Sequence, residues 1–83
     1  MDKPKIQIKF KELGEQRWLC WAVVPPECNH EFISWVNQTL NDRVMITHQN
    51  REYPPYGDRA PTITYELRGG NKGDSALLAL RWA

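Results

Sequence analysis

The sequence predicts a small α+β domain, with one helix packed on one face of a mostly antiparallel five-stranded sheet. Three observations support this class. Residues 25–42 repeat their apolar side chains at the helical period, five other short segments have strand-like apolar patterns, and clusters of Gly, Pro and Asn separate them. The expected order is β-β-α-β-β-β, and all 83 residues form one domain.

The first two strands are expected to form a hairpin. In residues 5–11, Ile6, Ile8 and Phe10 alternate with polar side chains, which is typical of a half-buried antiparallel strand. Residues 12–15 include Gly14 and supply the turn. Residues 17–24 are apolar on both faces, which indicates a central strand that is covered on both sides.

The predicted helix covers residues 25–42. Its apolar stripe consists of Cys28, Phe32, Trp35, Val36 and Leu40. The pair Pro25-Pro26 suits the first turn of a helix, because the N–H groups there have no helical partner.

Three more strands are expected after the helix. In residues 44–48 we expect Val44, Ile46 and His48 on one side. Residues 49–61 read as a loop or a proline-stiffened β-excursion, and residues 62–68 alternate again. Residues 69–74 form a turn, and the last strand covers residues 75–82, with apolar side chains on both faces from Ala76 to Leu80.

Composition sets limits on the class of protein. A net charge of +1 gives no overall preference for nucleic acid or anionic membranes. We expect Cys20 and Cys28 to be buried free thiols of a reducing compartment. Residues 1–5 lead into a polar-alternating segment, and the longest apolar run, residues 18–24, is far shorter than the ~20 residues that span a bilayer. We therefore expect a cytoplasmic protein.

The second face of the sheet is the leading candidate for a binding surface, because one helix covers only one face. The expected interface residues on the two strands with apolar side chains on both faces are Leu19, Trp21, Val23, Leu77 and Ala79. A second copy of the chain or another protein would cover them, unless the sheet curls enough to bury them itself. We therefore expect a non-enzymatic protein that binds a protein partner, as an inhibitor, an immunity-type protein or an adaptor, and self-associates as a homodimer.

The segment 48–61 offers an alternative function. It combines aromatic rings with cationic side chains: His48, Arg51, Tyr53, Tyr56 and Arg59. Such a set suits a small anionic or nucleotide-like ligand, or nucleic acid. The opposing interpretation is a surface turn whose arginines pair with Glu52 and Asp58, and these carboxylates argue against nucleic acid in particular.

Two weaker signals complete the analysis. A basic stripe that would follow a phosphate backbone consists of Lys3, Lys5, Lys9 and Lys11, with Arg17 across the expected hairpin. Lysines on a strand also discourage edge-to-edge aggregation. Cys28 and His30 point about 200° apart on a helix, so they do not share a metal ion. Because no nucleophile, phosphate-loop or dinucleotide motif occurs, we expect no catalytic residues, no metal and no cofactor.

Overall fold

Two successive β-β-α units make up the fold in the computed structural model, which describes residues 6–53, 55, 57 and 60–83, with only the backbone of Asp42. The first unit consists of β1 (Gln7–Glu12), β2 (Trp18–Val24) and α1 (Pro26–Trp35). The second consists of β3 (Val44–Glu52), β4 (Thr62–Gly69) and α2 (Lys72–Trp82). A π-helical turn (Val36–Leu40) and a 3-10 turn (Asn41–Arg43) connect α1 to β3.

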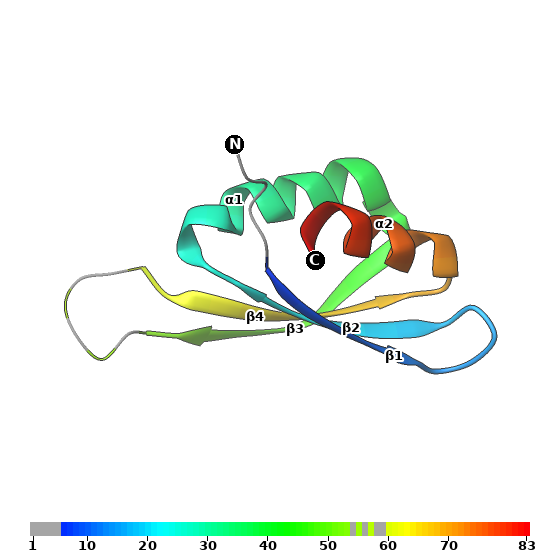
Figure 1. The fold of residues 1–83 in the computed structure, drawn as a ribbon, viewed down its shortest axis with the longest axis horizontal. Helices are drawn as coiled ribbons and strands as arrows, with labels where there is room; N and C mark the ends of the chain where they lie inside the picture. Colours follow the sequence, from blue (N-terminus) through cyan, green and yellow to red (C-terminus); the bar gives the residue numbers. More distant parts are fainter. Residues whose placement is uncertain (1–5, 54, 56, 58–59) are drawn as a thin grey trace.

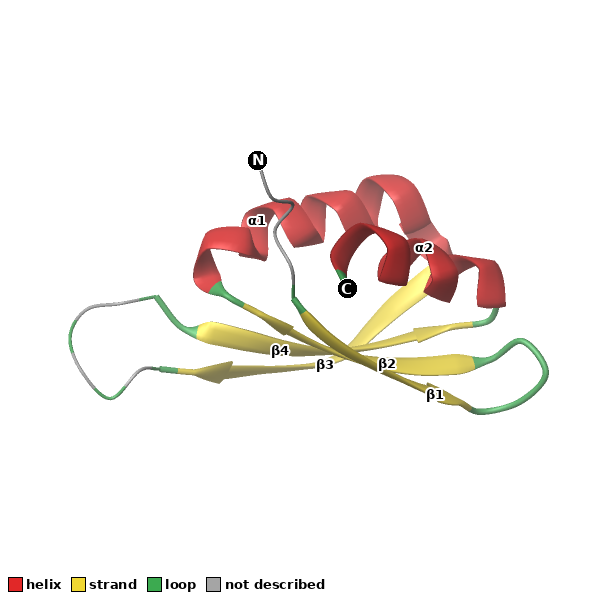
Figure 2. Ribbon diagram, viewed as in Figure 1, coloured by secondary structure: helices red, strands yellow, loops and turns green. Residues whose placement is uncertain are grey.

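The strands form one antiparallel sheet in the order β1-β2-β4-β3, so the two hairpins meet along β2 and β4. Both helices lie on the same face of this sheet (Figures 1 and 2). We call the other side, which no helix of the described chain covers, the open face. The predicted α+β class and antiparallel sheet are confirmed. The described residues form four strands and two helices, whereas the sequence predicts five strands and one helix.

The hydrophobic core lies between the helices and the sheet face that they cover. Strand β2 contributes every second residue to it: Trp18, Cys20, Ala22 and Val24. Strand β4 contributes Ile63, Tyr65 and Leu67 in the same way, as the alternation predicted. The ring centroid of Phe32 on α1 lies 5.3 Å from that of Trp82 on α2 and 5.7 Å from that of Tyr65. These aromatic contacts join both helices to the sheet.

The predicted helix is confirmed, and its buried stripe explains the wider π-helical turn at its end. Cys28, Phe32, Val36 and Leu40 are all buried at a constant spacing of four residues. Four residues of an α-helix advance by about 400°, so each step drifts about 40° away from the core. The wider π-helical turn from Val36 to Leu40 compensates for this drift and keeps both side chains inside. No helix within the described ranges is long and apolar enough to cross a membrane.

The predicted last strand, residues 75–82, is wrong, because this segment belongs to helix α2. The Asn71 side chain accepts a hydrogen bond of 2.8 Å from the Gly73 N–H and so caps the helix. Leu78 and Trp82, four residues apart, are fully buried, whereas Leu80 is 78% exposed. Alanine and leucine favour a helix, and this preference together with the cap decides the conformation.

Strand β3 also differs from the prediction. It continues to Glu52, well past the expected end at His48. The register shifts between Ile46 and His48, which makes Thr47 an extra residue in a β-bulge. Ile46 pairs with Leu67 on the helix-covered side, whereas His48 pairs with Glu66. The expectation that His48 shares a side with Val44 and Ile46 is therefore wrong, because the bulge turns His48 to the open face.

Candidate binding surfaces

The open face is lined by alternate residues of all four strands, because residues paired across strands point to the same side. The register assigns to it three residues of β1 (Gln7, Lys9, Lys11), three of β2 (Leu19, Trp21, Val23), four of β4 (Thr62, Thr64, Glu66, Arg68) and four of β3 (Met45, His48, Asn50, Glu52). Apolar side chains are therefore concentrated on β2, with polar and charged ones on both sides.

Trp21 lies at the centre of the open face. Its partner on β1 is Lys9 and its partner on β4 is Glu66, which in turn pairs with His48 on β3. The tryptophan is 36% exposed, so a large apolar ring with two oppositely charged neighbours faces outward. This environment suits an aromatic contact to a partner.

The other predicted interface residues differ from Trp21 in their exposure or position. Leu19 is only 8% exposed although no described helix covers it. Its two cross-strand neighbours are Lys11 and Arg68, whose aliphatic stems can cover it. Val23 is half-buried.

Leu77 and Ala79, which were also expected on this face, lie on α2, on the other side of the sheet. Their placement is corrected because the segment that carries them is helical.

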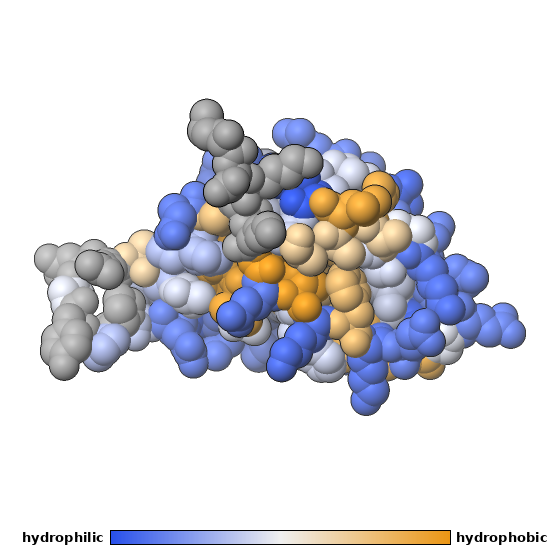
Figure 3. Space-filling model, in the orientation of Figure 1, coloured by the Kyte–Doolittle hydropathy of each residue, from blue (hydrophilic) through white to orange (hydrophobic). Residues whose placement is uncertain are grey.

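A second apolar surface, the α2–β1 patch, contains Leu77. Leu77 and Phe10 are each 40% exposed, and Leu80 is 78% exposed. Figure 3 shows apolar side chains spread from α2 towards β1 in this view, with hydrophilic residues around them. Sequence reasoning missed this patch because it treated residues 75–82 as a strand.

The structure describes three of the five residues expected to form a ligand site after β3. His48 and Arg51 both belong to β3, and their partners Glu66 and Ile63 lie on opposite faces of the sheet. Tyr53, at the end of this strand, is 69% exposed. Tyr56 and Arg59 lie outside the described residues.

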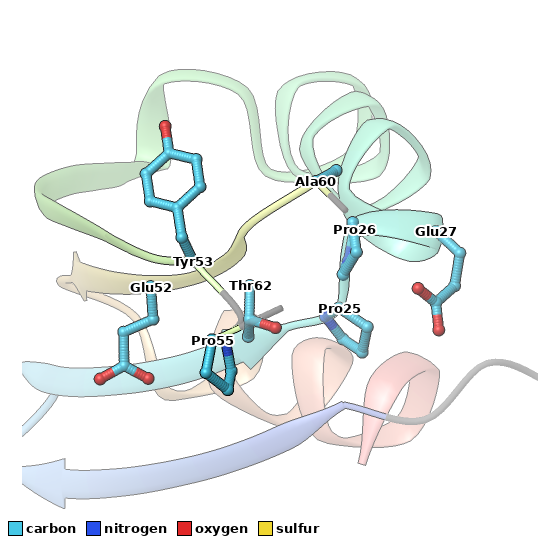
Figure 4. A pocket seen from close by; sticks show the side chains of 8 residues that line it. All are labelled: Pro25, Pro26, Glu27, Glu52, Tyr53, Pro55, Ala60 and Thr62. Carbon is cyan, nitrogen blue, oxygen red and sulfur yellow. The ribbon is translucent and has the colours of Figure 1, made fainter. Parts of the chain in front are cut away.

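A hollow of about 520 Å³ lies beside Tyr53. Its described lining is rich in proline and contains two carboxylates: Pro25, Pro26, Glu27, Glu52, Tyr53, Pro55, Ala60 and Thr62. Figure 4 shows Glu27 and Glu52 on opposite sides of it. Among the described residues, this lining holds two acidic side chains and offers no basic one to an anion.

A smaller hollow, of about 270 Å³, lies at the other end of the sheet. Its lining includes three arginines, so we call it the arginine hollow: Leu13, Arg17, Trp18, Arg43, Met45, Thr47, Arg68, Gly69 and Gly70. Sequence reasoning read the two glycines only as turn residues and did not connect the arginines, which lie in three separate segments.

The three arginines differ in their ion pairs. Arg43 lies 3.2 Å from the carboxylate of Asp74 and donates a hydrogen bond of 2.8 Å to the Thr39 carbonyl. Arg68 lies 3.2 Å from the carboxylate of Glu66. Arg17 has no ion pair with any described residue. The arginine hollow therefore contains one guanidinium group without a compensating carboxylate among the described residues.

The cysteines are both buried and free. Burial raises the pKa of the Cys20 thiol to about 12. Burial also raises the pKa of Cys28, and the nearby carboxylates of Glu27 and Glu31 raise it further. Both thiols are therefore protonated at neutral pH, which makes them weak nucleophiles and weak metal ligands. The described residues contain no group of three or more His, Cys, Asp and Glu side chains that could hold a metal ion.

Comparison of the chain with models of protein families, with curated proteins and with solved structures gave no match in any of the three.

Proposed function

We propose that this chain is a non-enzymatic binding protein, of the inhibitor, immunity-type or adaptor kind, which docks on a protein partner through its open face. Trp21 is the anchor of the proposed interface. The observation that carries the proposal is the contrast between the two central strands. Both use alternate residues for the core, yet their other residues differ in character.

Strand β4 provides an internal reference for a strand in this position. Towards the open face it presents Thr62, Thr64, Glu66 and Arg68, as expected for an antiparallel sheet in contact with water. Strand β2, beside it, presents Leu19, Trp21 and Val23. Because β4 is also a central strand and carries polar side chains on the open face, the fold itself does not require a tryptophan at position 21.

The open face is a better docking surface than the two sheet edges. Strand β1 is one edge, and it carries Lys9 and Lys11, which oppose pairing with another strand. Strand β3 is the other edge, and its bulge at Thr47 interrupts the regular row of backbone groups. Both features disfavour strand addition and leave contact through the face as the better route.

One pair of like charges on the open face favours an acidic partner over a second copy of the chain. In a face-to-face dimer with its two-fold axis along β2, β1 of one copy would stack on β4 of the other. Such stacking would place Lys11 opposite Arg68, because both flank Leu19 in one cross-strand row, whereas the row of Trp21 would place Lys9 opposite Glu66. A partner with carboxylates around an apolar centre avoids this repulsion.

Affinity capture with matched variants tests this proposal. The baits are the wild-type chain, Trp21→Ala on the open face and Leu80→Ala on the α2–β1 patch, each first shown by circular dichroism to be folded. We expect one protein to be retained by the wild type and by Leu80→Ala and lost with Trp21→Ala, and we expect the purified partner to bind with the same ranking. Loss with Leu80→Ala alone would assign binding to the α2–β1 patch and refute the proposal.

Self-association, which the sequence predicts, is tested separately. Its basis is weaker than the sequence suggested, because Leu77 and Ala79 do not lie on the open face. Light scattering over a concentration series should give the mass of a monomer if the partner is a different protein. A stable dimer that dissociates in Trp21→Ala would instead assign the open face to a second copy.

A further inference from the structure

We propose that the arginine hollow binds the phosphate group of a small phosphate monoester, whose apolar part rests against Leu13 and Met45. This inference goes beyond the proposed function, because it needs no protein partner. It also moves the anionic ligand expected near residues 48–61 to the opposite end of the sheet. There the described lining contains three arginines, whereas the hollow beside Tyr53 contains two glutamates.

The hollow exists because Gly70, which has no side chain, lies between residues that do have side chains. The Leu13 N–H donates a hydrogen bond of 2.9 Å to the Arg17 carbonyl, which extends the β1–β2 hairpin beyond Trp18. Trp18 pairs with Gly69, so one step further along the register Arg17 lies beside Gly70. A Cβ atom added to Gly70 would meet no atom within 4 Å. The missing side chain therefore leaves open space between the arginines.

The charge of this site favours an anion. Three arginines line the hollow, and the two carboxylates paired with them belong to Asp74 and Glu66, so three positive charges minus two negative charges leave +1. Arg43 uses its Nη2 atom for Asp74, and Arg68 uses Nε and Nη2 for Glu66. The Nη1 atoms of both arginines have no partner among the described residues, and they remain available as donors together with Arg17.

The arrangement of donors favours phosphate over carboxylate. A carboxylate is planar, and one guanidinium fork can satisfy both of its oxygens. A phosphate monoester carries about 1.5 to 2 negative charges and three oxygens that accept hydrogen bonds from several directions. The three arginines that line the hollow come from separate segments, namely the turn before β2, the segment before β3 and the end of β4.

The remaining lining suits an organic group attached to the phosphate. Leu13 is 44% exposed and Met45 is 67% exposed at the hollow. A volume of about 270 Å³ leaves room beyond a phosphate group. An apolar or aromatic moiety that covers these two side chains would bury surface that is now in water.

Titration with defined probes tests this proposal. Backbone amide shifts are followed by NMR while adenosine monophosphate, inorganic phosphate or adenosine is added at constant ionic strength. We expect saturable shifts with the nucleotide at Arg17, Gly69 and Gly70, and none with adenosine. Inorganic phosphate should bind at the same amides but more weakly if the apolar lining contributes.

Three variants, each checked by thermal unfolding, relate the binding to this site. Arg17→Gln should weaken nucleotide binding about tenfold, because a charged donor is lost. Gly70→Leu places a side chain in the open space and should abolish saturable binding. Lys9→Gln, on the same face but outside the hollow, should leave the Kd unchanged.

Four results would overturn the proposal. The first is the absence of saturable shifts with both phosphate and the nucleotide. The second is binding of adenosine as tight as that of the nucleotide. The third is an equal loss in Lys9→Gln and Arg17→Gln, which would indicate diffuse electrostatic attraction. The fourth is a folded Gly70→Leu variant that binds like the wild type.

Discussion

Gly69 lies beneath the indole ring of Trp18, and replacing it with alanine tests how the end of the sheet is packed. A Cβ atom at this position would lie 2.3 Å from Cζ2, 2.4 Å from Cε2 and 2.7 Å from Nε1 of Trp18. The tryptophan is only 2% exposed, so its ring has little space into which to retreat. Its Nε1–H also donates a hydrogen bond of 2.7 Å to the Asn71 carbonyl, just before α2.

The expected cost of Gly69→Ala is the sum of two effects. Overpacking of a filled core costs about 1–3 kcal/mol. Displacing the ring also breaks the bond to Asn71, which contributes about 0.5–1.5 kcal/mol. We therefore expect the free energy of unfolding to fall by about 1.5–4.5 kcal/mol, measured by urea unfolding with tryptophan fluorescence as the signal.

Gly70→Ala is the matched control for this prediction. Its added Cβ atom would meet nothing within 4 Å, and Gly70 does not have the positive φ that would strain an alanine. The unfolded chain loses freedom, so this variant should be neutral or more stable by up to about 1 kcal/mol. If the two variants unfolded at the same urea concentration, the close packing of Trp18 on Gly69 would be refuted.

Three further predictions follow from burial and charge. Trp82→Ala should lower the free energy of unfolding by about 3–5 kcal/mol and Leu80→Ala by less than about 0.5 kcal/mol, because Trp82 is 0% exposed and Leu80 is 78% exposed. Equal urea midpoints for the two variants would contradict this. Folding raises the pKa of Cys20 from its ordinary 9.0 to about 12, so the contribution of this thiol to stability is complete below pH 9 and is lost as the pH rises towards 12. Cys20→Ala should therefore lose less of its free energy of unfolding between pH 7 and pH 12 than the wild type does. Arg43→Met should lower the free energy of unfolding by about 1–3 kcal/mol, because it leaves the buried carboxylate of Asp74 without its cation. The loss should be smaller in an Asp74→Asn background, and additive losses in this double-mutant cycle would refute the coupling.

The sequence was sufficient to predict the elements whose hydrophobic pattern has one interpretation. The alternation of Ile63, Tyr65 and Leu67 identified β4, and the stripe from Cys28 to Leu40 identified the helical segment after β2. In both cases the buried residues occupy one face, so the period follows directly from the sequence.

Helix α2 was missed because residues 76–80 are all apolar, and a run without polar interruptions fits either period. Two available signals favour the helix, namely Asn71 as a cap and the spacing between Leu78 and Trp82. The bulge at Thr47 had no comparable signal, because a register shift depends on the pairing partner as well as on the strand's own residues.

The two candidate sites also differ in whether the sequence alone was sufficient to predict them. Trp21 was predicted because β2 is apolar on both faces, a property of one continuous segment. The arginine hollow was not predicted, because Arg17, Arg43 and Arg68 line one hollow only when the β1–β2 turn, the segment before β3 and the end of β4 lie together. A site assembled across strands requires the strand order, which this sequence does not specify.

Glu66 makes the centre of the open face more selective than an apolar patch would be. Any partner that covers Trp21 also removes water from this carboxylate, which is its direct cross-strand neighbour. Arg68 lies 3.2 Å from the carboxylate, and the Thr47 hydroxyl donates to it over 3.2 Å, so two donors already compensate one of its oxygens. Both contacts use Oε1, so a partner that also supplies a donor to Oε2 avoids the cost of burying an unsatisfied charge. The proposed partner therefore needs a hydrogen-bond donor beside the surface that covers Trp21, within an otherwise acidic rim, and this combination excludes most apolar surfaces.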